Sequence, residues 1–220
     1  MSIQETIRRI GETGIVPVIR AAHAAEASQA VEAVCAGGIS IVEITMTVPD
    51  APRLLREVAR ANSGFLIGAG TVLNAKQAEI CIDAGAQFLV SPGLSPEVIH
   101  TAAKNGVLAI PGAFTPTEVV AAIALGVDVI KIFPCSSGGG PSHLKSLLAP
   151  FPDCRFIPTG GVNLKNAEEY FAAGAFALGI GADLADLTAL RRNEAHKITE
   201  AAKSLTAIVH KHRAQMKLHA

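Results

Sequence analysis

Eight short apolar runs recur along this chain at intervals of about 20 to 27 residues, and no other feature restricts the possible fold as strongly. Alanine-rich segments with helical periodicity separate the runs. Several of these segments begin at Ser, Thr, Asn or Pro and end at Gly, the usual start and stop signals of helices. Strand followed by helix, with strands that are apolar almost throughout, predicts a parallel sheet covered by helices. The runs occupy 14–20, 39–46, 65–70, 87–92, 107–112, 128–134, 155–161 and 176–181.

Eight such units in 220 residues match an α/β fold of the (β/α)8 TIM-barrel type. The alternative is an open doubly wound sheet, which is disfavoured because no G-x-G-x-x-G motif follows the first run. The first residues, MSIQETIRRIGETG, have the pattern of a polar amphipathic helix, so we expect an extra N-terminal helix before the barrel. No linker or low-complexity segment divides the chain, and we expect one domain over residues 1–220.

The charge balance and the cysteines restrict the class of partner and the compartment. The chain has 19 Lys and Arg residues and 19 Asp and Glu residues, which argues against nucleic acid or an anionic membrane as partner and favours a small molecule. No apolar run reaches the roughly 18 residues of a membrane span, and no signal peptide is recognisable. The cysteines show no CxxC pair or zinc spacing, which predicts reduced thiols in a cytoplasmic protein; they are Cys35, Cys81, Cys135 and Cys154.

Chemistry is expected where the predicted strands end, because the active site of such a barrel is built at the carboxyl ends of its strands. Polar and charged residues at these ends should therefore meet at one mouth. None of the seven histidines lies at a strand end, so we expect no metal cluster. The residues at the strand ends are Arg20, Glu43, Thr45, Thr71, Ser91, Lys131 and Thr159, with glycines in the segments 68–70, 160–161 and 179–181.

Lys131 interrupts the apolar run Val129–Phe133, where an ammonium group is costly to bury without a partner. One interpretation is an outward-facing lysine whose stem packs between helices while its amine reaches water. The other is an amine inside the barrel, where low polarity favours the uncharged form that attacks a carbonyl group. Glu43 is a second charge in an equally apolar run. It is either a structural partner of Lys131 or Arg20, or the acid and base of the same reaction.

Three further features concern substrate binding. Arg20 is either a surface residue or a clamp for a carboxylate, and Thr71 could donate its hydroxyl to the same group. The segment 158–163, PTGGVN, follows the seventh run and precedes a helix, a position that frequently binds phosphate in these barrels through backbone N–H groups. The glycine-rich segment 136–141 lacks the lysine and the spacing of a phosphate loop and is expected to be a flexible connection that covers the site.

Seven motifs, in consistent order and spacing over about residues 5 to 185, resemble those of one enzyme family. The motifs are GIVPVIR, VEITMTVPDA, GAGTVLN, FLVSPGLSPEV, PGAFTPTEV, VIKIFP and FIPTGGVN. In these motifs the chain is similar to the bacterial 2-keto-3-deoxy-6-phosphogluconate (KDPG) aldolases, also called 4-hydroxy-2-oxoglutarate (KHG) aldolases. The resemblance implies a (β/α)8 barrel that is usually a homotrimer, forms a lysine Schiff base with a 2-keto acid, releases pyruvate and uses no metal or other cofactor.

Carried over by motif, the resemblance implies a catalytic pair. Lys131 of VIKIFP would form the Schiff base with the C2 ketone, and Glu43 of VEIT would be the general acid and base. Cleavage would yield pyruvate together with glyceraldehyde 3-phosphate from KDPG or glyoxylate from KHG. The implied substrate-binding residues are Arg20, Thr45, Thr71, Pro92 and Phe133 around the pyruvyl end, and Gly160, Gly161, Gly181 and Ala182 at the distal end.

Two positions depart from the family pattern. Some members carry an arginine four residues after the glutamate for the substrate carboxylate; this chain has Thr47 there, and Arg20 is the natural substitute. Many members have Gly-Ser after the last strand to hold phosphate, whereas this chain has Gly181-Ala182-Asp183. A missing hydroxyl and an added carboxylate would weaken phosphate binding. An unphosphorylated or galacto-configured 2-keto-3-deoxy sugar acid is therefore an alternative substrate.

Two other classes of function compete with the aldolase. A phosphate-binding barrel isomerase or synthase would share the TGG motif but would need no buried lysine on the sixth strand. A non-catalytic scaffold or binder would have no use for Lys131 and Glu43, whose burial costs free energy. The two charges in apolar runs therefore favour the aldolase.

Overall fold

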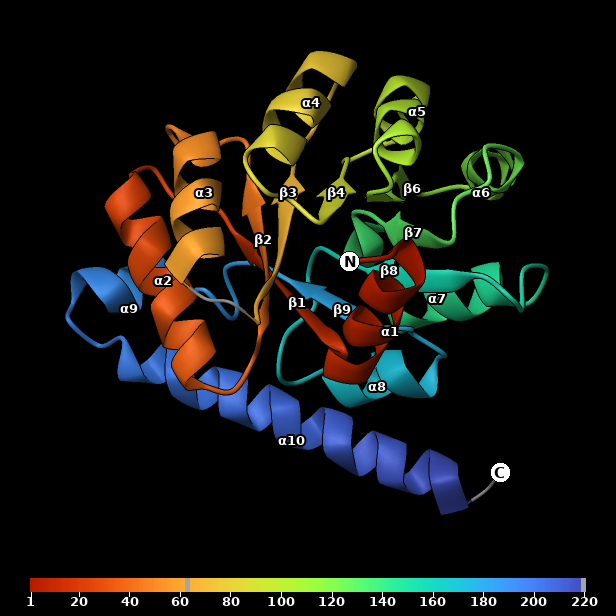
Figure 1. Cartoon of the computed structure of the whole chain (residues 1–220). Helices are drawn as coiled ribbons and strands as arrows, with labels where there is room; N and C mark the ends of the chain where they lie inside the picture. Colours follow the sequence, from red (N-terminus) through yellow and green to blue (C-terminus); the bar gives the residue numbers. More distant parts are fainter. Residues whose placement is uncertain (62–63, 219–220) are drawn as a thin grey trace.

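Short parallel strands alternate with helices in the computed structural model, which describes residues 1–61 and 64–218 (Figure 1). The strands are β1 (Ile15–Ile19), β2 (Ile41–Thr45), β3 (Leu66–Gly70), β4 (Phe88–Val90), β5 (Leu108–Ile110), β6 (Gly112–Ala113), β7 (Val129–Ile132), β8 (Arg155–Pro158) and β9 (Leu178–Ile180). The helices are α1 (Ile3–Thr13), α2 (Ala24–Ala36), α3 (Ala51–Ala61), α4 (Ala75–Asp83), α5 (Pro96–Lys104), α6 (Pro116–Ala124), α7 (Pro141–Leu148), α8 (Ala167–Ala172), α9 (Leu187–Arg191) and α10 (His196–Leu218).

The strands close into a barrel. Hydrogen bonds order β5-β4-β3-β2-β1-β9 in one sheet and β6-β7-β8 in another, and all these pairs are parallel. β5 and β6 are separated only by Pro111, which has no N–H group to donate to a neighbouring strand, so together they fill one strand position. A bridge between Thr159 and Gly179 joins β8 to β9 and completes the ring. The predicted (β/α)8 fold is confirmed.

The barrel interior is filled by every second residue of the strands. Phe88 lies in this interior, and Gly68 on the neighbouring strand leaves room for its ring, because a Cβ at that glycine would overlap it. Ile7 and Ile10 of α1 belong to the same buried cluster, and α1 contacts both β1 and β5. This expected extra helix therefore closes the N-terminal end of the barrel. The strand residues of the cluster are Val16, Ile41, Leu66, Phe88, Val90, Leu108, Ile110, Val129 and Ile157, and Ala177 directly precedes β9.

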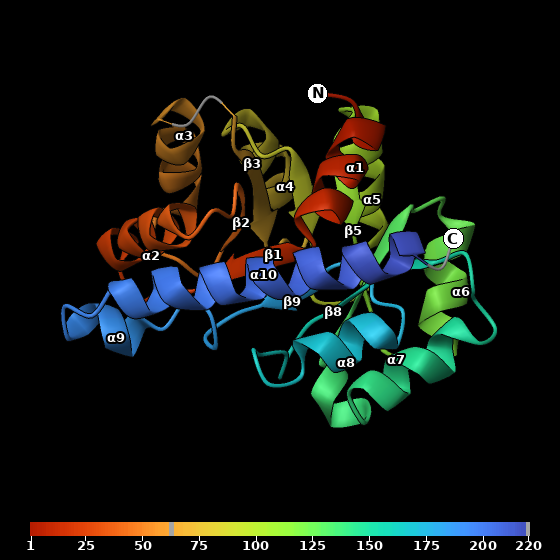
Figure 2. The same cartoon turned by 90° about the horizontal axis from the view of Figure 1, so that it is seen from below.

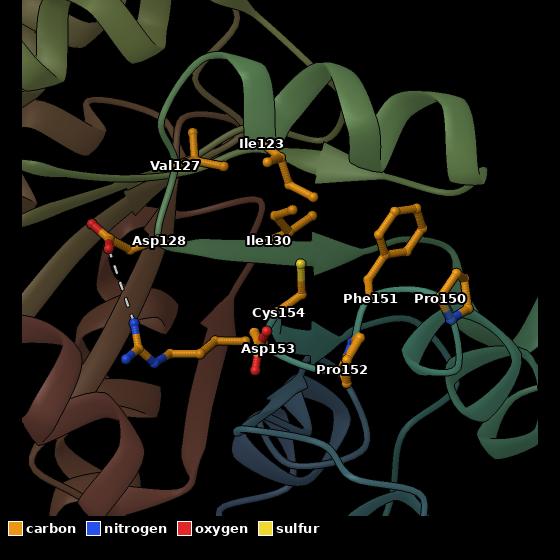
Figure 3. Close-up of a pocket in the computed structure, with 10 residues that line it drawn as sticks. Ile123, Val127, Asp128, Ile130, Pro150, Phe151, Pro152, Asp153 and Cys154 are labelled. Atoms are coloured by element: carbon orange, nitrogen blue, oxygen red, sulfur yellow. Dashed lines mark ion pairs between the residues drawn. The ribbon is translucent and has the colours of Figure 1, made fainter.

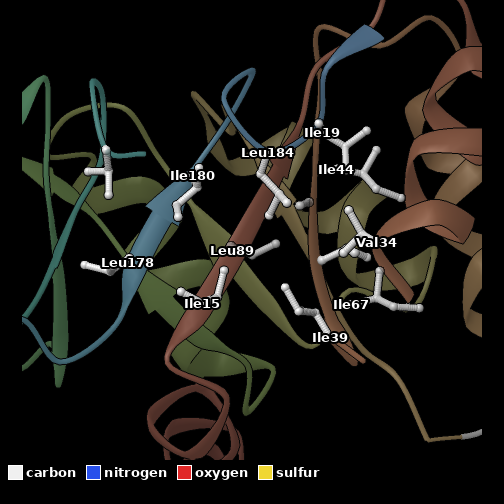
Figure 4. Packing of buried hydrophobic residues seen from close by; sticks show 14 of the residues in the cluster. Ile15, Ile19, Val34, Ile39, Ile44, Ile67, Leu89, Leu178, Ile180 and Leu184 are labelled. Atoms are coloured by element: carbon white, nitrogen blue, oxygen red, sulfur yellow. The ribbon is translucent and has the colours of Figure 1, made fainter. Parts of the chain in front are cut away.

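The other face of the strands packs against the helices. Figure 4 shows this layer around β1 and β9, where Ile15 and Leu178 are buried in the same cluster as Val34 of α2. α10 lies across the outside of the molecule against α2 and α8 (Figures 1 and 2). Within residues 1–61 and 64–218, no helix combines the length and the apolar character needed to cross a membrane. The predicted helix starts at polar side chains are confirmed where these accept an N–H bond from the first turn, at Asn74, Ser95 and Thr115.

Candidate active site

Lys131 lies in the inward-facing series of β7, two residues after Val129 of the interior cluster. Its side chain is 7% exposed, and its sheet neighbours are Gly112 and Ile157. Nζ lies 4.9 Å from the centroid of the Phe133 ring, and among the described residues the amine has no hydrogen-bond or ion-pair partner. The buried position excludes the outward-facing, solvated lysine. An unpaired amine thus sits inside the barrel wall.

Glu43 lies in β2, beside Val18 of β1 and Gly68 of β3. Its side chain is 3% exposed, and Oε1 has no hydrogen-bond partner within the described part of the chain. Burial raises the pKa of this carboxyl group, and the attraction of Lys131 and Arg20 offsets the rise only in part. A carboxyl group that keeps its proton to higher pH than usual is suited to both giving and taking a proton.

The end of β3 shapes the site on two sides. Gly70 leaves space for the Glu43 carboxyl group, because a Cβ at this glycine would overlap Oε1. The next residue, Thr71, has a φ of 57°, a left-handed conformation that costs a non-glycine residue about 1–3 kcal/mol. The Thr71 hydroxyl accepts a hydrogen bond from Nη2 of Arg20 at 3.4 Å. The strained turn therefore places a hydroxyl and a guanidinium together.

Arg20 is held from behind by a chain of hydroxyl groups. Its Nη1 donates to Thr47 Oγ1 at 3.4 Å, and the Thr47 hydroxyl lies 2.7 Å from that of Thr45. Thr45 is fully buried and donates to the carbonyl oxygen of Ile19 at 3.1 Å. Thr45, predicted as a substrate-binding residue, thus lies behind Arg20, where it orients the guanidinium through Thr47.

A cavity of 410 Å³ opens at the carboxyl ends of the strands. Glu43 and Thr45 do not form part of its wall, whereas the other residues predicted for the site do. Sequence reasoning missed Val18 and Val162, and assigned no role to Thr159. Val18 and Thr159 stand two residues before Arg20 and Gly161, so the two-residue period of a strand would have found them. The lining residues are Val18, Arg20, Thr71, Pro92, Lys131, Phe133, Thr159, Gly160, Gly161, Val162, Gly181, Ala182 and Asp183.

The distal end of the cavity begins with the loop after β8. Gly160 and Gly161 have φ values of 89° and 77°, which only glycine adopts without strain. The N–H group of Ser136 donates to the carbonyl oxygen of Gly160 at 3.1 Å. The segment expected to be a flexible glycine-rich connection thus contains a 3₁₀ turn, Cys135–Gly138, that is bonded to this loop.

The turn after β9 completes the distal end. The carbonyl oxygen of Gly181 accepts N–H bonds from Leu184 at 3.0 Å and Ala185 at 2.9 Å, which folds the chain around Asp183. Asp183 is exposed and lines the cavity. Four N–H groups around this end donate to no protein group among the described residues; they belong to Gly161, Val162, Ala182 and Asp183.

A second cavity of the same volume, 410 Å³, lies at the opposite ends of β7 and β8 (Figure 3). Asp128 and Arg155 form an ion pair of 4.0 Å there. Burial raises the pKa of the Cys154 thiol, which makes this lining residue a poor nucleophile. The cavity that contains Lys131 is therefore the candidate active site, because it alone of the two has an unpaired buried amine in its wall.

Groups that could hold a metal ion are dispersed in the described structure. No cluster of three His, Cys, Asp or Glu side chains occurs in residues 1–61 and 64–218, and His219 lies outside these residues.

A model of the family described as KDPG and KHG aldolase matches residues 6–201. The chain belongs to this family. The chain is 34% identical to the 2-dehydro-3-deoxy-phosphogluconate aldolase of Pseudoalteromonas atlantica over 193 residues, which cover 88% of this chain and 90% of the relative. The KHG/KDPG aldolase of Escherichia coli is 33% identical over 189 residues, which cover 86% and 89% of the two chains.

The solved structure of a KDPG aldolase from Legionella pneumophila has the same fold. The two structures agree with a TM-score of 0.84 at 31% identity, over 91% of this chain and 97% of the other. That enzyme holds pyruvate captured at low pH as a covalent carbinolamine intermediate. The KDPG and KHG aldolase resemblance of the sequence motifs is thus confirmed.

Proposed function

We propose that this chain is a Schiff-base aldolase that cleaves the KDPG or KHG type of 2-keto acid to pyruvate and an aldehyde. The aldehyde would be glyceraldehyde 3-phosphate from KDPG and glyoxylate from KHG. One observation carries the proposal: the buried Lys131 amine has no partner among the described residues and lines a 410 Å³ cavity. Family membership and the nearby Glu43 carboxyl group, whose pKa burial raises, support it.

The reaction begins when Nζ of Lys131 attacks the C2 ketone and the carbinolamine loses water to give an iminium ion. Glu43, acting through a water molecule, removes the proton of the C4 hydroxyl. The C3–C4 bond then breaks, its electron pair moves into the iminium to form an enamine, and the aldehyde leaves. Protonation of the enamine at C3 and addition of water release pyruvate and restore the amine. The buried Glu43 carboxyl group holds the proton between these steps.

Arg20 and Thr71 are proposed to bind the substrate carboxylate. The guanidinium has donors on two nitrogens, and its contacts with Thr47 and Thr71 are long, at 3.4 Å, so a carboxylate can compete for them. Pro92 and Phe133 line the same cavity and supply its apolar wall. Gly160, Gly161, Gly181 and Ala182 surround the distal end of the substrate.

Reductive trapping tests this function. Sodium borohydride in the presence of pyruvate should add one pyruvate-derived group to the peptide that carries Lys131, as detected by mass spectrometry. Lys131→Met should give no adduct, whereas the control Lys104→Met, at an exposed site on α5, should be trapped like the wild type. Glu43→Gln should still be trapped but turn over roughly 100-fold more slowly or worse, because a general acid and base typically contributes that much. A wild type that is not modified at Lys131 would refute the mechanism.

We further propose that the protein is a cytoplasmic homotrimer. Large apolar side chains are exposed on α6, with Val120 at 55% and Ile123 at 44%, and beside and within α4, with Leu73 at 54% and Ile80 at 38%. Two different apolar surfaces are what a closed ring of identical subunits requires. The cysteines are free, which supports a reducing compartment.

A further inference from the structure

Charge is distributed unevenly along the active-site cavity. Lys131 and Arg20, the basic side chains of its wall, accompany the residues proposed to hold the pyruvyl end. Asp183 is the acidic side chain of the wall, and it lies in the turn after β9. No lysine, arginine or histidine of the described lining accompanies the distal glycines, Gly160 and Gly161. The end of the cavity that is proposed to receive the tail of the substrate therefore has an acidic residue and no basic one among its described lining.

A phosphate dianion and an aspartate carboxylate do not suit each other as neighbours. Both accept hydrogen bonds and neither donates one, and their negative charges repel. Ala182, beside Asp183, has no hydroxyl to donate to a phosphate. A sugar hydroxyl behaves differently, because it can donate to the Asp183 carboxylate and at the same time accept from a backbone N–H group. The N–H group of the exposed Gly161, which has no protein partner in the described structure, is available for this.

We propose that Asp183 is a specificity-determining residue that selects a substrate with a neutral, hydroxyl-bearing tail over one with a terminal phosphate. The preferred substrate class is then an unphosphorylated 2-keto-3-deoxy sugar acid. This inference rests on the proposed aldolase function, and it concerns only the part of the substrate that does not react. Asp183 is exposed and makes no hydrogen bond among the described residues, so we expect its replacement to leave the fold intact.

The test compares kcat/KM for 2-keto-3-deoxygluconate and for its 6-phosphate. The wild type should prefer the unphosphorylated acid. Asp183→Asn keeps the shape of the side chain and removes its charge. It should shift the ratio of the two kcat/KM values toward the phosphorylated acid by about tenfold, because that is the effect of one charge on a doubly charged group several ångströms away in a largely aqueous setting. Asp153→Asn removes the same charge from the exposed surface at the other end of the barrel and should leave the ratio unchanged.

Each result has one meaning, because pyruvate trapping is measured on the same preparations. If the wild type is trapped at Lys131 but Asp183→Asn leaves the substrate ratio within twofold of the wild type, the inference about Asp183 is wrong and the aldolase function stands. A strong wild-type preference for the phosphorylated acid would overturn the inference in the same way. If no preparation is trapped, the proposed function itself fails.

Discussion

At the scale of the single residue, the Glu43 carboxyl group has a buried oxygen without a hydrogen bond among the described residues. Burying such an oxygen lowers the stability of the folded protein. The neighbouring amine and guanidinium stabilise its charged form without pairing with it, and burial outweighs them. The same environment that keeps the proton on the carboxyl group makes it useful for proton transfer. The burial that makes the Glu43 carboxyl group useful for proton transfer therefore also lowers the stability of the fold.

The cost should be visible as a pH dependence of stability. In the unfolded chain Glu43 titrates near its ordinary value of 4.5, whereas in the folded protein its pKa is higher. Above about pH 4.5 the folded state then binds more protons than the unfolded state, so rising pH favours unfolding. Relative to Glu43→Gln, the wild type should lose stability as the pH rises above about 4.5, by up to about 1.4 kcal/mol per pH unit until the folded group titrates.

Urea unfolding of both proteins across this pH range measures the difference. Glu79→Gln, at an exposed position on α4, is the matched control and should differ from the wild type by a nearly constant amount. A difference for Glu43→Gln that stays flat with pH would show that burial does not raise the pKa.

At the scale of the element, β3 is built around its neighbours' side chains. Gly68 makes room for Phe88, and Gly70 makes room for the Glu43 carboxyl group. Gly70→Ala should therefore displace Glu43, lower kcat and destabilise the protein by about 1–3 kcal/mol, as overpacking does. Borohydride should still trap pyruvate, since Lys131 is on another strand.

The control is Gly93→Ala, because an added Cβ there meets no atom within 4 Å. It should change the free energy of unfolding by less than about 0.5 kcal/mol. A Gly70→Ala variant that is as stable and as active as the wild type would show that the Glu43 carboxyl group is not confined by β3.

The strands could be predicted from sequence because each is a short apolar run between helix signals, and Lys131 and Glu43 stood out as charges within such runs. Details that depend on the contacts between neighbouring strands could not be predicted from the sequence. Thr45 has the right alternation for the cavity, yet its hydroxyl donates to the Ile19 carbonyl of the neighbouring strand. The left-handed backbone of Thr71 is likewise set by the turn and not by the residue type, since threonine does not favour it.

At the scale of the whole molecule, the trimer proposal predicts that association depends on the exposed apolar face of α6. Val120→Lys should convert a species of three times the chain mass into one of a single chain, because burying an unpaired ammonium in an interface is unfavourable. Light scattering coupled to size-exclusion chromatography measures the mass. Lys203→Glu, an exposed charge change on α10, should leave the mass unaltered.

If Val120→Lys leaves a threefold mass intact, α6 does not form the interface. If the wild type has the mass of one chain, the trimer proposal itself is wrong. The organisation of residues 1–220 as one domain stays a prediction, and the ring formed by β1 to β9 in the described residues supports it.

The helix α1 packs through Ile7 and Ile10 against the N-terminal end of the barrel, so the cavity that contains Lys131 opens at the other end, at the carboxyl ends of the strands. On the proposed function, the substrate enters and both products leave at this end of the barrel. In the proposed complex the pyruvyl half is bound to Lys131, and the aldehyde half lies toward the exposed residues Ala182 and Asp183. The aldehyde therefore has to depart first, and water has to follow it inward before pyruvate can be set free. A helix at the N-terminal end of the barrel is thus linked to the order in which the products leave at the carboxyl ends of the strands.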